Sequence, residues 1–249
     1  MSKARALRRA ALLCALAGPA AAVDCAPIEH LGQPFTVCTV DAASADLRLF
    51  LRDKDTGRPL ASFGNVEERL EAAGERLVFA MNAGMYHSDR RPVGHYVEDG
   101  ETLAPVIPSA GPGNFGMLPN GVFCIAEGRA DVVETLRFVE EAPACRHATQ
   151  SGPMLVIDGA LHPRFLPDSD RRHVRNGVGS SADGRTVWFA ISEAPVTFHE
   201  FGTLFRDALG APQALYFDGS ISRLYAPALN RHDGGFPMGP MVGVVAPRD

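Results

Sequence analysis

Short apolar segments that end at a tight-turn dipeptide recur along the chain and constrain its fold more than any other feature. The turn dipeptides are Asp99-Gly100, Glu127-Gly128, Asp158-Gly159, Asp183-Gly184 and Asp218-Gly219. An Asp-Gly pair between two short β-forming segments is a strong signal for a β-hairpin. Because a hairpin joins antiparallel neighbours, the sequence predicts a protein with many antiparallel strand pairs.

Alternating or continuous apolar residues mark the strands between these turns. The predicted strands cover residues 35–41, 46–52, 77–82, 96–98, 101–103, 121–126, 131–135, 153–157, 185–192 and 214–217. Two helices are predicted, one from a cap at Asn65 to Gly74 and one over residues 198–209. The second begins with a capping box formed by Thr197 and Glu200. We therefore expect an α+β (mixed α/β) fold, with a mostly antiparallel or mixed β-sheet core of one or two sheets flanked by a few helices.

The first 22 residues have the layout of a secretory signal peptide. Four basic residues precede an apolar run from Ala10 to Ala17, and a small-residue cleavage site ends at Ala22. The run is too short to anchor the chain in a bilayer. We expect cleavage near Ala22-Val23, a mature domain of residues 23–249 without a membrane span, and a periplasmic or secreted location.

Four cysteines remain in the mature chain, and an even number in an exported protein predicts disulfides. Three pairings are possible. Cys25–Cys38 and Cys124–Cys145 are favoured because each closes a short local loop. A zinc site is disfavoured, since the chain lacks a C-x-x-C motif and a paired-histidine spacing.

The charge of the mature chain limits its partners. Residues 23–249 contain 20 of the 24 basic residues and all 29 acidic ones, which gives a formal net charge of −9. This balance is unfavourable for non-specific binding of nucleic acid. An anionic ligand would have to be held by local arginines.

Four loops of small and polar residues lie next to predicted strands, where binding and catalytic groups tend to lie. They are N-A-G-M-Y-H (82–87), Q-S-G-P (150–153), R-N-G-V-G (175–179) and D-G-S (218–220). In this order the motifs resemble the phosphodiester glycosidase family, and most closely its bacterial branch, over about residues 77–245. The family pattern maps onto Asn82, Gly84, Tyr86, Gly152, Arg175, Asp218 and Gly219. One enzyme of the family has a run of glycines before a serine, whereas here Ser220 directly follows Gly219, so the accepted sugar is expected to differ.

Hydrolysis at the C1 atom of a sugar passes through an oxocarbenium-like state that two carboxylates usually handle. Asp218 and Glu193 are the candidate catalytic residues, because both follow predicted buried strands. A phosphate leaving group departs without a strong acid, since its second pKa is about 6. Arg175 suits a phosphate clamp, because a guanidinium binds a phosphoryl group through two parallel hydrogen bonds.

The remaining candidates would bind the substrate. Asn82, Asn176 and Ser220 can hydrogen-bond sugar hydroxyls, and Tyr86 offers a stacking face. With the glycines of the motifs, the substrate-binding set is Asn82, Gly84, Tyr86, Gly152, Arg175, Asn176, Gly219 and Ser220.

These residues predict an exported glycosidase that hydrolyses the C1–O bond of a small-molecule or glycan sugar-1-phosphodiester. Two alternatives stay open: a non-catalytic periplasmic binding protein for a phosphorylated glycan or envelope polymer, and a metal-dependent phosphodiesterase. The sequence indicates no required cofactor, and it leaves open a bound cation, the sugar, the aglycone and the oligomeric state.

Overall fold

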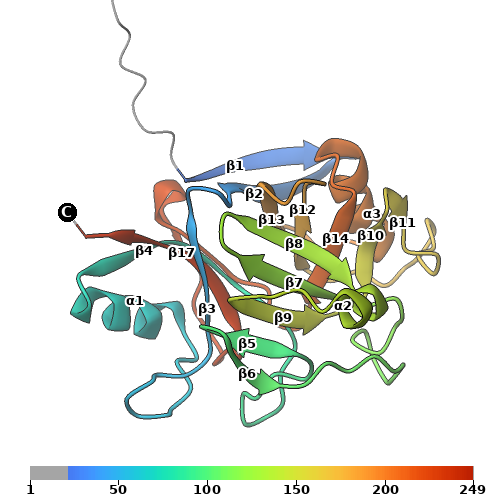
Figure 1. Cartoon of the computed structure of the whole chain (residues 1–249). Coiled ribbons are helices and arrows are strands. Elements are labelled where there is room, and N and C mark those ends of the chain that lie inside the picture. The colour runs from blue at the N-terminus through green and yellow to red at the C-terminus, as the bar shows by residue number, and fades with distance from the viewer. Residues whose placement is uncertain (1–21, 249) are drawn as a thin grey trace, which may run out of the picture.

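The computed structural model describes residues 22–248, and strands dominate it (Figure 1). The predicted signal peptide lies outside the described residues, apart from Ala22. The strands are β1 (Val23–His30), β2 (Gln33–Asp41), β3 (Asp46–Phe50), β4 (Glu75–Asn82), β5 (Tyr96–Glu98), β6 (Glu101–Ala104), β7 (Gly121–Ala126), β8 (Arg129–Glu134), β9 (His147–Ser151), β10 (Met154–Ile157), β11 (Ala160–Leu161), β12 (Asn176–Ser180), β13 (Thr186–Ser192), β14 (Gln213–Asp218), β15 (Leu224–Ala226), β16 (Arg231–His232) and β17 (Met241–Pro247). The helices are α1 (Phe63–Ala72), α2 (Thr135–Glu141) and α3 (Phe198–Thr203), with a π-helical turn η1 (Leu204–Ala208) and a 3-10 turn η2 (Pro227–Leu229).

The strands form three antiparallel sheets, where the sequence had predicted one or two. The largest sheet has the order β1-β2-β13-β12-β14-β10-β11. The second has the order β16-β15-β4-β17-β3, and the third β6-β5-β9-β7-β8. The predicted preference for antiparallel neighbours is confirmed, because every strand pair among the described residues is antiparallel. The Asp99-Gly100 turn shows why: both residues have positive φ, 49° and 81°, as a tight two-residue hairpin turn requires.

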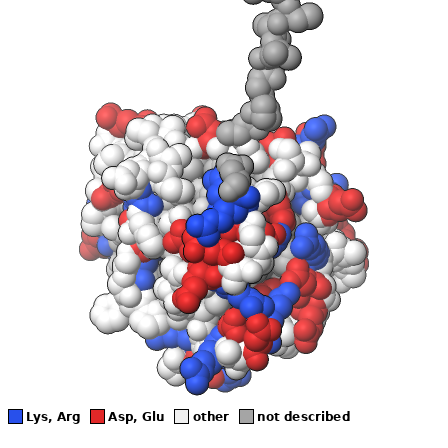
Figure 2. All heavy atoms as spheres, turned by 90° about the vertical axis from the view of Figure 1, so that its left-hand side faces the viewer, with Lys and Arg blue, Asp and Glu red and all other residues white. Residues whose placement is uncertain are grey.

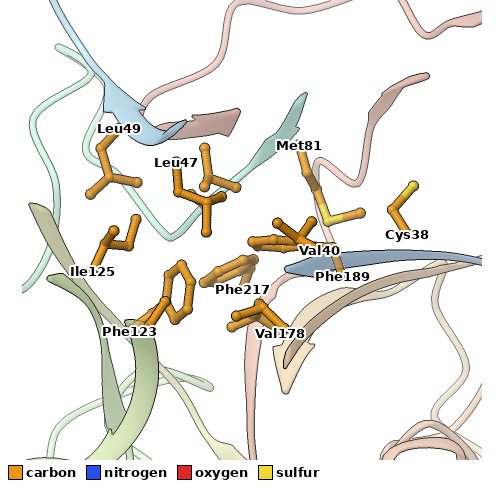
Figure 3. Close-up of a cluster of buried hydrophobic side chains, with 14 of the residues drawn as sticks. Cys38, Val40, Leu47, Leu49, Met81, Phe123, Ile125, Val178, Phe189 and Phe217 are labelled. Carbon is orange, nitrogen blue, oxygen red and sulfur yellow. The ribbon is translucent and has the colours of Figure 1, made fainter. Parts of the chain in front are cut away.

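The main hydrophobic core lies where the three sheets meet (Figure 3). Phe189 of β13 packs against Phe79 of β4 and Phe123 of β7, with ring centroids 4.9 and 5.7 Å apart. Phe123 also contacts Phe217 of β14 at 6.4 Å. Phe217 directly precedes Asp218, so the end of β14 is anchored in the most buried part of the molecule.

Each helix packs on one sheet, and Phe138 of α2 packs on the β7–β9 sheet. Phe63, Val66 and Leu70 of α1 pack on the β4–β17 sheet, and the α3–η1 segment packs on the largest sheet. The capping box of Thr197 and Glu200 is confirmed. The predicted cap at Asn65 is wrong: Ser62 caps α1, and its Oγ accepts from the Asn65 N–H. The helix starts earlier because Phe63 and Val66 must both face the core.

Both predicted disulfides are confirmed. Cys25 lies opposite Cys38 in the β1–β2 ladder, and Cys124 of β7 joins Cys145 just before β9. Within residues 22–248, no helix is both long enough and apolar enough to cross a membrane. The face on the α1 side of Figure 1 is shown in Figure 2, where basic and acidic side chains are interspersed. Two residues of α1, Arg69 and Glu71, form ion pairs with Asp55 and Arg248.

Candidate functional site

Asp218 is the last residue of β14 and lines a cavity. The segment Ala214–Phe217 is fully buried, and Asp218 itself is only 8% exposed. Its Oδ1 accepts hydrogen bonds from the backbone N–H groups of Gly219 and Ser220, at 2.6 and 2.8 Å. A rigid strand and a capped turn thus hold the carboxylate in one orientation.

Two asparagines fix the loop that follows Asp218. Asn82 of β4 and Asn176 of β12 are 0% exposed and hydrogen-bond each other through their amides. Asn176 Oδ1 also accepts from the Asp218 N–H at 3.2 Å. Asn82 Oδ1 accepts from the Arg223 N–H, and Asn82 Nδ2 donates to the Ile221 carbonyl. Their amide groups are therefore used by the protein itself, and we infer that they position the Asp218 loop rather than bind sugar hydroxyls.

Tyr216 and Gly219 lie next to each other in the lining of the cavity. A Cβ atom on Gly219 would lie 2.1 Å from the Tyr216 hydroxyl oxygen, so only glycine fits beside this phenol. Tyr216 is fully buried, and burial raises the pKa of its hydroxyl well above the usual value.

The cavity around Asp218 has a volume of about 420 Å³, large enough for a sugar ring. It is lined by Met85, Tyr86, Asn114, His173, Tyr216, Asp218, Gly219, Ser220 and Ile221. Four of the predicted residues meet here: Tyr86, Asp218, Gly219 and Ser220. The Tyr86 hydroxyl donates to the Pro237 carbonyl, which fixes the ring at the cavity wall.

Burial shapes the ionisation of the groups in this cavity. The loss of water raises the pKa of Asp218, while the backbone N–H groups of Ser220, Gly219 and Ile221 oppose the rise. Burial, followed by the negative charge of Asp218, also raises the pKa of Tyr86. A carboxylate with a raised pKa in a cavity is a feature of catalytic sites, although structural networks produce it as well.

Arg175 directly precedes β12 and is 1% exposed. Its guanidinium stacks on the Phe198 ring, with Cζ 3.7 Å from the ring centroid, and lies 5.5 Å from the Tyr216 centroid. Nε donates to the Val196 carbonyl and Nη2 to the Arg171 carbonyl. Nη1 is buried without a hydrogen-bond partner in the described chain. Burial lowers the pKa of this guanidinium, as expected for a cation without a counterion.

Arg175 lines a second, larger cleft of about 760 Å³. Asn114 and His173 lie on the walls of both spaces, so the cleft adjoins the Asp218 cavity. The other lining residues are Met117, Arg164, Phe165, Leu166, Asp168, Ser169, Asp170, Arg171, Phe198 and His199.

Three predicted site residues lie elsewhere. The Glu193 carboxylate accepts hydrogen bonds from Arg231 and Thr36, at 2.5 and 2.6 Å, and it lines neither the cavity nor the cleft. The expected pair of catalytic carboxylates is therefore not brought together. Gly84 packs against Thr149 of β9, and Gly152 packs against Asn120. Both glycines allow close approach of neighbouring segments and do not line the cavity.

Sequence reasoning missed Met85, Asn114, His173, Tyr216 and Ile221. Asn114 lies in a long loop with no motif, and Tyr216 lay inside a run interpreted as core. A signal did exist for His173, because Arg171, His173 and Arg175 alternate, and residues two apart in an extended segment share one face. Across residues 22–248 there is no group of three or more His, Cys, Asp or Glu side chains arranged to hold a metal ion.

Comparisons with known proteins give the family and the fold of the chain. A family model described as phosphodiester glycosidase matches residues 75–245. The uncharacterized protein YigE of Escherichia coli K12 is 36% identical over 150 residues, which are 60% of this chain and 58% of YigE. The chain therefore spans less than two thirds of this relative.

Solved structures show a similar fold. The zebrafish N-acetylglucosamine-1-phosphodiester alpha-N-acetylglucosaminidase catalytic domain, auto-inhibited by its pro-peptide, has a TM-score of 0.62 and 11% identity, over 89% of this chain and 81% of that chain. A hypothetical protein from Synechocystis has a TM-score of 0.61 and 14% identity, over 89% and 61%. An exported protein of Burkholderia pseudomallei, described as putative, has a TM-score of 0.57 and 12% identity, over 85% and 74%.

Proposed function

Because the chain belongs to the phosphodiester glycosidase family, we propose that it hydrolyses the C1–O bond of a sugar-1-phosphodiester in the periplasm or outside the cell. The observation that carries this proposal is the buried Asp218 carboxylate, aimed into a sugar-sized cavity that adjoins a cleft rich in arginine. Export is supported by the two disulfides and by the layout of residues 1–22.

The proposed chemistry needs one carboxylate at the sugar. As the bond from C1 to the phosphate oxygen breaks, the ring gains positive charge, which the ionised Asp218 stabilises. The same carboxylate then accepts a proton from the attacking water. Tyr86, Asn114 and Ser220, on the walls of the cavity, orient the sugar by stacking and hydrogen bonds.

The leaving phosphate is held on the cleft side. Nη1 of Arg175 is the group of this guanidinium without a protein partner, and a phosphate oxygen supplies the missing acceptor. His173, on the wall between the two spaces, can donate a hydrogen bond to the same phosphate. A phosphate monoester leaves without a strong general acid, because its second pKa is about 6. The scheme therefore works without Glu193 in the cavity.

A panel of sugar-1-phosphodiesters tests the proposal, with release of free sugar as the readout. Reaction in water enriched in oxygen-18 places the label in the sugar if the C1–O bond breaks. Label in the phosphate would show P–O cleavage and contradict the proposal. Saturable binding of these compounds without any release of sugar would identify a binding protein instead.

A further inference from the structure

The cleft beside the Asp218 cavity is lined by three arginines and two aspartates, Asp168 and Asp170. Arg164, Arg171 and Arg175 line it, and within residues 22–248 none of the three forms an ion pair with a carboxylate. By contrast, both arginines of a cavity of about 610 Å³ next to β7 and β8 are paired, Arg129 with Asp131 and Arg137 with Asp158. The face in Figure 2 is likewise a mixture of both signs. Other arginines among the described residues, such as Arg52, Arg76 and Arg223, donate to backbone carbonyls and also lack an ion pair, but this cleft brings three such arginines together in an acidic protein.

One wall of this cleft is built around the buried Arg175, whereas Arg164 and Arg171 are exposed. Arg175 is held by the Phe198 ring and by two backbone carbonyls, it lines the cleft, and its Nη1 is buried without a partner in the described chain. Phe198 in turn stacks on Phe165 with ring centroids 5.0 Å apart and an interplanar angle of 7°. A buried cation without a counterion is costly unless an anion reaches it. The cleft is therefore suited to a negatively charged ligand.

The cleft has more basic groups than one phosphate needs. Arg175 lies beside Tyr216, whose ring also lines the Asp218 cavity, so Arg175 is next to the bond that breaks. Arg164 and Arg171 line only the cleft and remain for a second anionic group. Asp168 and Asp170 line the same space, and carboxylates there can accept hydrogen bonds from hydroxyl groups.

We propose that this cleft is a leaving-group subsite that selects a hydroxyl-bearing unit carrying a second phosphate beyond the one bonded to the sugar. Glycans or polyols joined by repeated phosphodiesters have this chemistry. The inference rests on the proposed function for its orientation, because Asp218 places the sugar in the smaller cavity. The subsite adds the chemical class of the leaving group, which lies on the phosphate side of the C1–O bond.

Binding of leaving-group products tests the subsite without any turnover. Calorimetry compares glycerol 1-phosphate with glycerol 1,3-bisphosphate at low salt. We expect the bisphosphate to bind at least about tenfold more tightly, the size of one charge-assisted contact, and added salt to reduce this difference. Arg164→Gln and Arg171→Gln should each weaken the preference, and the double variant should abolish it. Arg137→Gln, which removes a paired arginine from the other cavity, should retain it.

Turnover supplies the second comparison. Sugar-1-phosphodiesters whose leaving group is glycerol 1-phosphate or glycerol 1,3-bisphosphate are compared by kcat/KM, and the bisphosphate leaving group should be favoured at least about tenfold. Hydrolysis of both substrates at equal kcat/KM, or equal binding of the two glycerol phosphates, would overturn the subsite while leaving the proposed function standing. Preferential binding of the bisphosphate without release of sugar would support the anionic cleft and reject the hydrolase.

Discussion

Asp218 is subject to two opposing influences, since burial disfavours its charged form and the backbone N–H groups of its own turn favour it. Burial is the larger effect, so the pKa of the carboxyl group is raised on folding. The folded state therefore binds a proton more readily than the unfolded chain does. It follows that ionised Asp218 reduces the stability of the protein, as is common for catalytic groups.

Replacement of Asp218 by Asn separates its catalytic role from its capping role. Asn keeps an oxygen acceptor for the Gly219 and Ser220 N–H groups and removes the charge. We expect a folded protein whose turnover falls by orders of magnitude. Its thermal stability at pH 7 should equal or exceed that of the wild type, because the buried charge is gone.

The pH dependence gives the control for this variant. A raised carboxyl pKa costs the wild type nothing below the unfolded value of 3.8, and the cost grows as the pH rises through the folded value. Any stability gain in Asp218→Asn should therefore disappear as the pH is lowered toward 3.8. Near-normal hydrolysis by the folded variant would reduce Asp218 to a turn cap.

Arg175→Lys tests the phosphate clamp. A lysine ammonium cannot keep both backbone hydrogen bonds of Arg175 and also supply the donor that Nη1 offers, so we expect a loss of about 2 kcal/mol or more in transition-state stabilisation. The measurement is kcat/KM on a sugar-1-phosphodiester and on a nitrophenyl glycoside that lacks phosphate. A loss confined to the phosphodiester supports the clamp. Because Arg175 also stacks on Phe198 and binds two carbonyls, an equal loss on both substrates would show a structural role.

At the scale of elements, the site depends on three strand termini that lie close together: the last residues of β4 and β14 and the first residue of β12. Asn82 and Asn176 join the ends of β4 and β12 and hold the loop that follows β14. The two asparagines come from different sheets, so the second and largest sheets must pack correctly before the loop takes its shape.

Gly219→Ala tests the tightness of that loop. The new Cβ atom would lie 2.1 Å from the Tyr216 hydroxyl oxygen, so the phenol or the loop must move. We expect a loss of roughly 1–3 kcal/mol in the free energy of unfolding, the usual cost of overpacking, together with a large loss of activity.

Gly64→Ala is the matched control. Gly64 lies in α1, where a Cβ atom meets nothing within 4 Å, so alanine should stabilise the helix by up to about 1 kcal/mol. Urea denaturation measures both variants. Unchanged stability and activity in Gly219→Ala would show that the loop is loose and that the close approach has no functional role.

For the whole molecule, the two disulfides and the sequence of residues 1–22 make a joint prediction about maturation. Protein recovered from the periplasm should begin near Val23, and its intact mass should increase by four hydrogens on full reduction. Retention of residues 1–22, or four free thiols under oxidising conditions, would contradict export by this route. Reduction should also lower the stability, by roughly 2–4 kcal/mol for each lost cross-link.

The sequence by itself determined the local features of this protein. Asp99-Gly100 and Asp158-Gly159 specify hairpins through the positive φ of both turn residues, and the short cysteine spacings specified both disulfides. The apolar run before Asp218 was sufficient to predict a buried strand ending at this carboxylate. Each of these features depends on residues that are neighbours in the chain, so no long-range contact was needed to predict it.

Tertiary structure alone decided which polar groups meet. The lining of the Asp218 cavity comes from chain segments near residues 85, 114, 173 and 218, and nothing local shows that these segments converge. Asn82 shares a motif with Tyr86 of the cavity and Asn176 with Arg175 of the cleft, yet packing between two sheets buries both asparagines completely. Glu193 follows a buried strand as Asp218 does, but Arg231 and Thr36 take up its carboxylate. The physical reason is the same in each case, because the burial and partners of a side chain depend on how distant strands pack.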